Sequence, residues 1–157
     1  MIYKSYIIEK SLGNLEKKIV LFYGENLGLK NDFKKKIISI HNKKKIFKYN
    51  QEDILKNNNL LLNEIKNLSL FEDAKVFIIE QVDDRFLEFI KEYEEDIIGQ
   101  EIYFFSEILE KKSKIRNYFE KSKDYGCIAC YKDNEISIRK IIMERLNGFK
   151  GLTNQNI

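Results

Sequence analysis

Short apolar runs alternate along this chain with longer segments of helical periodicity, and this alternation is the feature that most limits the possible folds. A run of four to six apolar residues matches a strand that is buried on both faces, which is typical of a parallel sheet covered by helices. The sequence therefore predicts an α/β domain with a five-stranded, mainly parallel sheet and helices on both faces. The predicted strands are Ile19–Tyr23, Ile46–Tyr49, Val76–Glu80, Ile102–Phe105 and Gly126–Tyr131.

The segments between these runs repeat apolar residues every three or four positions, which is the spacing of one face of a helix. Asn31 and Asp32 suit the first turn of one helix, and Asp83 and Asp84 suit the start of another, because free N–H groups there need acceptors. A further helix is predicted over Leu60–Leu68. The apolar faces consist of Leu29, Phe33, Ile37 and Ile40; of Leu61, Ile65 and Leu68; of Phe86, Phe89, Ile90 and Tyr93; and of Ile115, Tyr118 and Phe119.

The chain of 157 residues is long enough for one domain with a sizeable core and too short for two independent domains. We expect an α/β domain over residues 1–134 and the start of a small helical domain over residues 135–157. Asp133 and Asn134 can cap a helix in this second part, and no later segment offers its apolar stripe a partner. The sequence is therefore expected to be cut from a longer protein or completed by a partner. The stripe consists of Ile138, Ile141, Ile142 and Leu146.

The composition excludes some classes of protein. With 43% hydrophobic and 34% charged residues, the chain matches neither a disordered tail nor a membrane protein. It has no apolar stretch long enough to cross a bilayer and no signal peptide at its start, so we expect a cytoplasmic protein. The net charge of +3 limits contact with nucleic acid to local patches, for which solvated faces are the favoured interpretation. The patches are Lys34–Lys36, Lys43–Lys45, and Lys111, Lys112 and Lys114 with Arg116.

The segment Gly24–Asn31 follows the first predicted strand, in the position of a phosphate-binding loop between a strand and a helix. A working P-loop has four residues between its glycines, followed by Lys and then Ser or Thr. Here three residues separate Gly24 from Gly28, Lys30 is displaced, and Glu25 adds a carboxylate. The sequence therefore predicts a nucleotide-binding layout with a degenerate site, and no cofactor.

Acidic residues follow the third predicted strand, where a nucleotide hydrolase places an Asp for magnesium and a Glu to position water. Glu80 and Gln81 are poor substitutes for that pair. Asp83 and Asp84 are two adjacent carboxylates without a third ligand nearby, so the start of a helix is favoured over a metal site. The sequence predicts neither a metal site nor a catalytic residue.

Cys127 and Cys130 have the two-residue spacing of a redox pair or half of a zinc site. They lie in a predicted strand, where residues three apart point to opposite faces of the sheet. The chain has no second pair, and His41 is remote in sequence, so buried free thiols are favoured. His41 is interpreted as a residue at the end of a helix.

Leu68, Ser69, Leu70 and Phe71 are followed at once by two acidic residues, which places large apolar side chains beside charges at the end of a helix. These residues can seal an edge of the sheet. Alternatively, the Leu-Phe pair can protrude and fill a hydrophobic pocket on a partner, as an interface hot spot does. The local sequence supports both interpretations equally.

Several segments, taken in order, resemble the delta subunit of the bacterial DNA polymerase III clamp loader. The likeness extends over roughly residues 18–150, and its order and spacing are more specific than any single motif. The matching segments are Ile19–Glu25, Ser69–Phe71 with the strand Lys75–Ile79, and Lys114–Lys121 leading to Cys130 and Tyr131.

The resemblance implies an AAA+-like, P-loop-type first domain that has lost ATP binding and is a non-catalytic accessory subunit in DNA replication. It implies that the protein binds and opens the ring-shaped sliding clamp with Leu70 and Phe71 as a wedge, supported by Leu68 and Ser69. The implied partners are the clamp, the other loader subunits, mainly through C-terminal domains that this sequence lacks, and DNA through the assembled complex, with no membrane. The alternative is a P-loop-type ATPase or other nucleotide-binding enzyme with an atypical loop.

Overall fold

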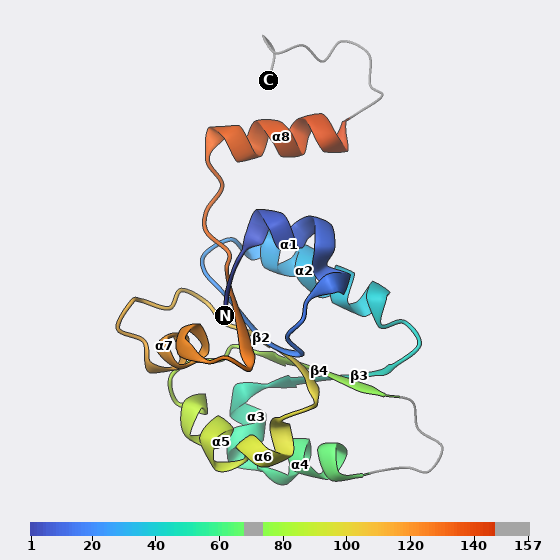
Figure 1. The fold of residues 1–157 in the computed structure, drawn as a ribbon, viewed down its shortest axis with the longest axis vertical. Coiled ribbons are helices and arrows are strands. Elements are labelled where there is room, and N and C mark those ends of the chain that lie inside the picture. Colours follow the sequence, from blue (N-terminus) through green and yellow to red (C-terminus); the bar gives the residue numbers. More distant parts are fainter. Residues whose placement is uncertain (68–73, 147–157) are drawn as a thin grey trace.

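A six-stranded sheet forms the centre of the protein in a computed structural model, which describes residues 1–67 and 74–146 (Figure 1). The strands of this described part are β1 (Ile2–Lys4), β2 (Ile19–Tyr23), β3 (Lys45–Asn50), β4 (Lys75–Glu80), β5 (Glu101–Phe105) and β6 (Tyr125–Ala129). Its helices are α1 (Ser5–Ser11), α2 (Leu27–Ile40), α3 (Gln51–Lys56), α4 (Asn59–Lys66), α5 (Phe86–Glu92), α6 (Glu94–Ile97), α7 (Lys114–Lys121) and α8 (Glu135–Arg145), with a short 3₁₀ helix, η1 (Leu12–Asn14).

All neighbouring strands run parallel, in the order β1-β6-β2-β5-β4-β3, which confirms the predicted α/β class with a parallel sheet. The described sheet has six strands where the sequence predicted five, because β1 adds an edge strand beside β6. This strand has only three residues and Ile2 is 61% exposed, so no apolar run marks it. It is held at its start by the Cys127 N–H, which donates to the Met1 carbonyl oxygen at 2.8 Å.

Side chains alternate along the strands between two core clusters, one on each face of the sheet. In β2, Ile19, Leu21 and Tyr23 belong to one cluster, and Val20 and Phe22 belong to the other. Residues of α3 to α7 complete the first cluster, and residues of α1, η1 and α2 complete the second. The result is three layers, with helices on both faces as predicted (Figure 1).

Aromatic packing sets α2 against the sheet. The Phe22 ring of β2 lies 5.0 Å from the ring of Phe33 in α2 and stacks on Phe105 of β5 at 4.8 Å, measured between ring centroids. Burying each of these side chains stabilises the fold by roughly 1.5–3 kcal/mol. The packing fixes the start of α2 at the carboxyl end of β2, where the candidate site lies.

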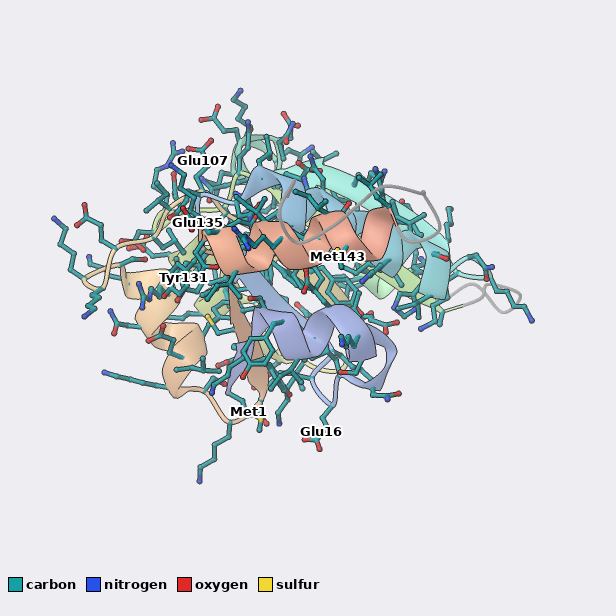
Figure 2. All side chains as sticks on the ribbon, turned by 90° about the horizontal axis from the view of Figure 1, so that it is seen from above. Met1, Glu16, Glu107, Tyr131, Glu135 and Met143 are labelled. Atoms are coloured by element: carbon teal, nitrogen blue, oxygen red, sulfur yellow. The ribbon has the colours of Figure 1, made fainter. Side chains whose placement is uncertain are left out.

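Helix α8 lies on the side of the sheet that carries α1 and α2, and Figure 2 shows it from above with Glu135 and Met143 labelled. The side chains of Ile136, Ile138 and Met143 are exposed, and no described residue of α8 belongs to either core cluster. The helix expected after Asn134 is thus present. The division into domains at residues 134 and 135 stays a prediction.

Candidate functional site

The carboxyl ends of β2 and β5 are adjacent, and the chain leaves them toward opposite faces of the sheet. After β2 it enters α2, whose buried residues belong to one core cluster, and after β5 it reaches α7, whose buried residues belong to the other. Such a divergence creates the crevice in which doubly wound sheets bind ligands. The loop with the predicted degenerate nucleotide site lies at this crevice.

The loop between β2 and α2 is short and closely packed. It consists of Gly24–Asn26, so Gly28 lies within the first turn of α2 instead of in the loop. The φ angle of Gly24 is 130°, and a Cβ atom there would lie 2.2 Å from the carbonyl oxygen of Cys130. Since this position needs both a positive φ and a close backbone approach, only glycine fits it. The Gly24 N–H donates to the carbonyl oxygen of Glu107 at 2.9 Å, which ties the loop to the end of β5.

Asn26 occupies the start of α2, where a phosphate would bind in a working nucleotide site. Its Oδ1 accepts the Leu29 N–H at 3.0 Å, and its Nδ2 donates to the carboxylate of Asp133 at 2.8 Å. The carboxylate of Glu25 accepts the Lys132 N–H at 3.3 Å. The helix N-terminus therefore already has an acceptor from its own chain, and two carboxylates beside it disfavour an anion.

Lys30 bridges the crevice. Its side chain is buried, with 7% of the residue exposed, and its Nζ donates to the carbonyl oxygen of Ser106 at 2.8 Å. Burial lowers the pKa of Lys30 because the ammonium group loses hydration, and nearby Cys130 and Glu107 partly offset this effect. A phosphate-binding lysine points into the ligand site, whereas Lys30 holds the segment after β5 against α2. Three of the predicted loop residues, Gly24, Glu25 and Lys30, thus form hydrogen bonds with the segments that follow β5 and β6.

The acidic residues at the end of β4 and after it are bonded within the protein. Glu80 pairs with Lys34 at 2.7 Å. Asp83 accepts from Gln51 Nε2 at 2.9 Å and from Arg85 Nη2 at 2.8 Å, and the buried Gln51 accepts the Asp83 N–H at 2.8 Å. Burial opposes ionisation of Asp83, but the hydrogen bonds from Arg85 and Gln51 outweigh it and lower the pKa of this carboxyl. Asp83 therefore holds α3 and the segment before α5 together.

Asp84 acts as a helix cap, although of a different helix from the one expected. Its Oδ1 accepts the Ser113 hydroxyl at 2.6 Å and the Ile115 N–H at 3.0 Å at the start of α7, not of α5. Ser113 in turn accepts the Arg116 N–H at 3.3 Å. Among the residues that the structure describes, no group of three or more His, Cys, Asp or Glu side chains is placed to hold a metal ion.

The two cysteines are buried free thiols in different core clusters, which confirms that they point to opposite faces of the sheet. Burial raises the pKa of both Cys127 and Cys130 to about 12, so neither is a thiolate at neutral pH. His41 caps the carboxyl end of α2, as expected, and its Nε2 lies 3.1 Å from the Tyr103 hydroxyl. Burial lowers the pKa of His41.

The residues predicted to form the wedge lie outside the described part of the chain. The residues on either side of them are connected by one side chain, because Lys75 at the start of β4 donates to the carbonyl oxygens of Glu64 at 2.8 Å and Asn67 at 2.9 Å. These bonds join the end of α4 to the start of β4 around the segment. The wedge residues are Leu68, Ser69, Leu70 and Phe71.

Sequence patterns do not single out Gln51, Ser106 or Ser113. Their hydrogen bonds hold together the segments that follow the carboxyl ends of the strands. The Ser106 hydroxyl donates to the carbonyl oxygen of Val82, and the Ser106 carbonyl accepts from Lys30. The available signal is a polar residue shortly after a strand. Many residues without a function share that signal, so it identifies none of them alone.

No protein-family model matches the chain, and no curated protein is significantly similar to it. No described helix is both long and apolar enough to cross a membrane. The established features are therefore the parallel α/β fold and the hydrogen bonds that join the segment after β2 to the segment after β5.

Proposed function

We propose that this protein is a clamp-loader subunit of the delta type, which binds and opens a ring-shaped sliding clamp and does not bind ATP itself. Leu70 and Phe71 form the wedge that enters a hydrophobic pocket on the clamp, and Leu68 and Ser69 support it. The ring opens because the wedge binds the open clamp more tightly than the closed one, and a ligand shifts an equilibrium only through such a difference.

The observation that carries the proposal is the set of hydrogen bonds that takes up the position of a phosphate-binding loop after β2. A parallel sheet with a loop and a helix at a switch point is a layout found in nucleotide-binding domains, and an AAA+-like domain is the form that we propose. In this chain the Lys30 ammonium is bonded to the Ser106 carbonyl, and Asn26 caps α2. Such a domain, with its phosphate position taken up by its own side chains, suits a loader subunit that works by binding a partner.

The described residues on either side of the wedge segment also support the proposal. Lys75 joins Glu64 to Asn67 and to the start of β4, so both ends of the segment start from ordered elements of the fold. A wedge on such a base can bind a partner without unfolding its own domain, because the elements next to it are packed into the core. Leu61, Leu62 and Ile65 of α4 are all buried there.

The decisive experiment measures binding to the sliding clamp of the same organism by surface plasmon resonance. Leu70→Ala with Phe71→Ala removes both anchors, and two hot-spot side chains together contribute about 4 kcal/mol, so binding is expected to weaken roughly a thousandfold. The matched control is Ile98→Ala with Ile108→Ala, which removes two exposed apolar side chains elsewhere and leaves binding unchanged. Circular dichroism verifies that both variants are folded.

Binding to the clamp that survives the wedge substitutions unchanged would refute the proposed contact. A second arm titrates the protein with a fluorescent ATP analogue and magnesium, and no saturable binding is expected up to roughly millimolar concentrations. Saturable binding in the micromolar range would favour the nucleotide-binding enzyme instead. In that case the bond between Lys30 and Ser106 would have to open, which Lys30→Met would test.

A further inference from the structure

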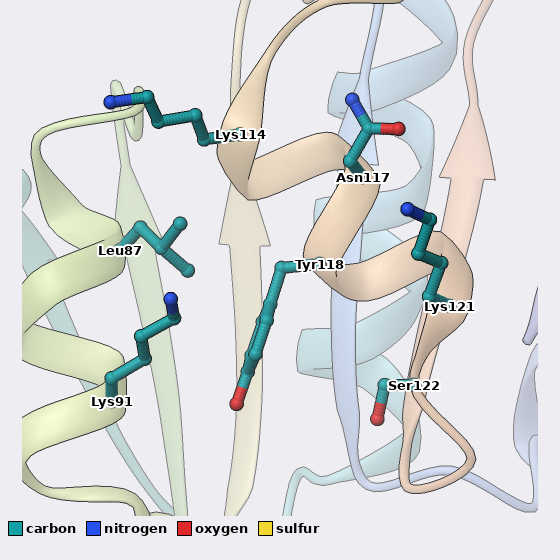
Figure 3. A pocket seen from close by; sticks show the side chains of 7 residues that line it. All are labelled: Leu87, Lys91, Lys114, Asn117, Tyr118, Lys121 and Ser122. Atoms are coloured by element: carbon teal, nitrogen blue, oxygen red, sulfur yellow. The ribbon is translucent and has the colours of Figure 1, made fainter.

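A groove of about 470 Å³ lies between α5 and α7, two helices that cover the same face of the sheet (Figure 3). Figure 3 shows Leu87 and Lys91 pointing from α5 toward α7, and Lys114 and Tyr118 pointing from α7 toward α5. Lys121 lies farther along α7 in the same lining. None of its lining residues lies in the loop after β2 or in α2.

Three lysines give the groove its charge. Lys114 and Lys121 are seven residues apart on one face of α7, so they are about 10 Å apart along the helix axis. Lys91 faces them from α5. None of the three forms an ion pair with a residue that the structure describes, so their charges are available to a ligand.

Two carboxylates that interact electrostatically with Lys114 and Lys91 have closer partners within the protein. Asp84, near the start of α7, accepts the Ser113 hydroxyl at 2.6 Å. Glu94, at the start of α6, accepts the hydroxyls of Tyr118 at 2.6 Å and Tyr125 at 2.8 Å. The fold thus uses both carboxylates for its own hydrogen bonds and leaves the rim of the groove cationic.

The floor of the groove is apolar and is not a stacking platform. Leu87 is 7% exposed and contributes to the core. The Tyr118 ring has the Lys91 ammonium 5.5 Å above its centroid and the Tyr125 ring at 5.8 Å. The lining thus has one aromatic ring with a cation near it, whereas a single nucleic-acid strand binds to several rings on which successive bases stack.

We propose that the groove between α5 and α7 binds an acidic peptide segment of a partner protein. Aspartate or glutamate side chains of the peptide pair with Lys91, Lys114 and Lys121, and one aliphatic or aromatic side chain fills the hollow over Leu87 and Tyr118. Charge complementarity selects the acidic sequence, and burial of the apolar side chain provides most of the affinity. The inference does not rest on the proposed clamp-binding function.

The test uses fluorescence anisotropy with the whole chain and a fluorescein-labelled peptide of about ten residues, in which glutamates flank one leucine and one phenylalanine. The same peptide with both apolar residues changed to serine reports binding by charge alone. A single-stranded oligothymidylate of equal length reports binding by nucleic acid. Affinity for the first peptide is expected to fall at least tenfold from about 50 mM to about 500 mM NaCl, because salt screens exposed charges.

Lys114→Gln with Lys121→Gln removes two of the three charges and is expected to weaken binding of the acidic peptide roughly five- to twentyfold. The matched control is Lys10→Gln with Lys35→Gln, which changes the net charge equally on the face that carries α1 and α2. This control is expected to bind as the parent does, and circular dichroism verifies the fold of both variants.

Three outcomes would overturn the proposal. The first is no binding of the acidic peptide at low salt. The second is equal binding of the serine peptide, which would make the groove a general anion site. The third is tighter binding of oligothymidylate that the Lys114 and Lys121 substitutions abolish, which would make it a nucleic-acid surface.

Discussion

Replacing Gly24 with alanine would place a methyl group against a backbone carbonyl. The φ angle of 130° at Gly24 costs an L residue about 1–3 kcal/mol. The added Cβ would also lie 2.2 Å from the carbonyl oxygen and 2.7 Å from the carbonyl carbon of Cys130. These are backbone atoms, so they cannot turn aside as a flexible side chain does.

The expected loss in the free energy of unfolding can be worked out from the hydrogen bonds that the substitution breaks. Ordinary contact begins at 3.4 Å, so the Cys130 carbonyl has to move by about 1 Å. That movement disrupts the bond from the Cys130 N–H to the Tyr23 carbonyl at 2.6 Å and from the Asn26 N–H to the Cys130 carbonyl at 3.1 Å. At about 1 kcal/mol for each bond plus the backbone cost, Gly24→Ala should lower the free energy of unfolding by about 3–5 kcal/mol.

Urea unfolding followed by far-ultraviolet circular dichroism measures this loss. With an m value of about 2 kcal/mol/M, the midpoint is expected to fall by roughly 1.5–2.5 M. Gly99→Ala is the matched control, because Gly99 has a φ of 93° but no neighbouring atom within 4 Å of an added Cβ. It has the backbone cost alone, so its midpoint should fall by roughly 0.5–1.5 M. Gly13→Ala, whose nearest neighbour is at 3.9 Å, should change little.

Equal midpoints for Gly24→Ala and Gly99→Ala would refute this reasoning. They would show that the loop after β2 is not pressed against Cys130 in solution. The loop would then lie farther from Cys130 than it does in the structure. One of the contacts that disfavour a phosphate site would be absent.

Two other features give measurable expectations. Asp84→Ala removes the acceptor for the Ser113 hydroxyl and the Ile115 N–H, and should lower the free energy of unfolding by about 1–2 kcal/mol in urea melts. Asp84→Asn keeps one acceptor and should lose less, so equal losses would contradict the capping role. Burial raises the thiol pKa of Cys127 and Cys130 from 9.0 to about 12, so the unfolded chain loses these protons first as the pH rises. The contribution of the buried, protonated thiols to the free energy of unfolding is complete below pH 9. It declines between pH 9 and 12, by up to about 1.4 kcal/mol per pH unit for each thiol. Urea melts across this range should decline less steeply for Cys127→Ala with Cys130→Ala, and an unchanged slope would show that the thiols are exposed.

The central strands could be predicted from sequence because burial on both faces leaves a continuous apolar run. The predicted bounds of Ile19–Tyr23 are those of β2, whose five residues are all buried. The runs at Val76–Glu80 and Ile102–Phe105 each miss one residue, the polar first residue of β4 and of β5. The helix predicted at Leu60–Leu68 is described over Asn59–Lys66 as α4.

Elements without a strong pattern were missed or misplaced. The strand β1 and the helices α1, α3 and α6 are short, and each of these helices has only one buried apolar residue, whereas the predicted α5 has four in seven residues. The cap of α2 was expected near Asn31 and Asp32, but the helix begins a turn earlier, where Asn26 accepts the Leu29 N–H. Propensity places a cap within a few residues, and packing selects which acceptor reaches the helix.

The sequence predicted where in the fold the candidate site lies, but not which residues bond to one another there. Its loop could be located after the first long strand because the glycines and the lysine are neighbours in sequence. The opposite orientation of Cys127 and Cys130 followed in the same way from alternation along a strand. Such local rules depend on the backbone geometry of one element, which the sequence itself encodes.

Contacts between distant segments were decided by the tertiary structure alone. The partner of Lys30 is the Ser106 carbonyl, 76 residues away, and the partner of Asp83 is Gln51, 32 residues away. The groove between α5 and α7 likewise exists only where two helices pack on the same face of the sheet. A single sequence specifies which side chains can bond, but the order of strands in the sheet decides which of them come within bonding distance.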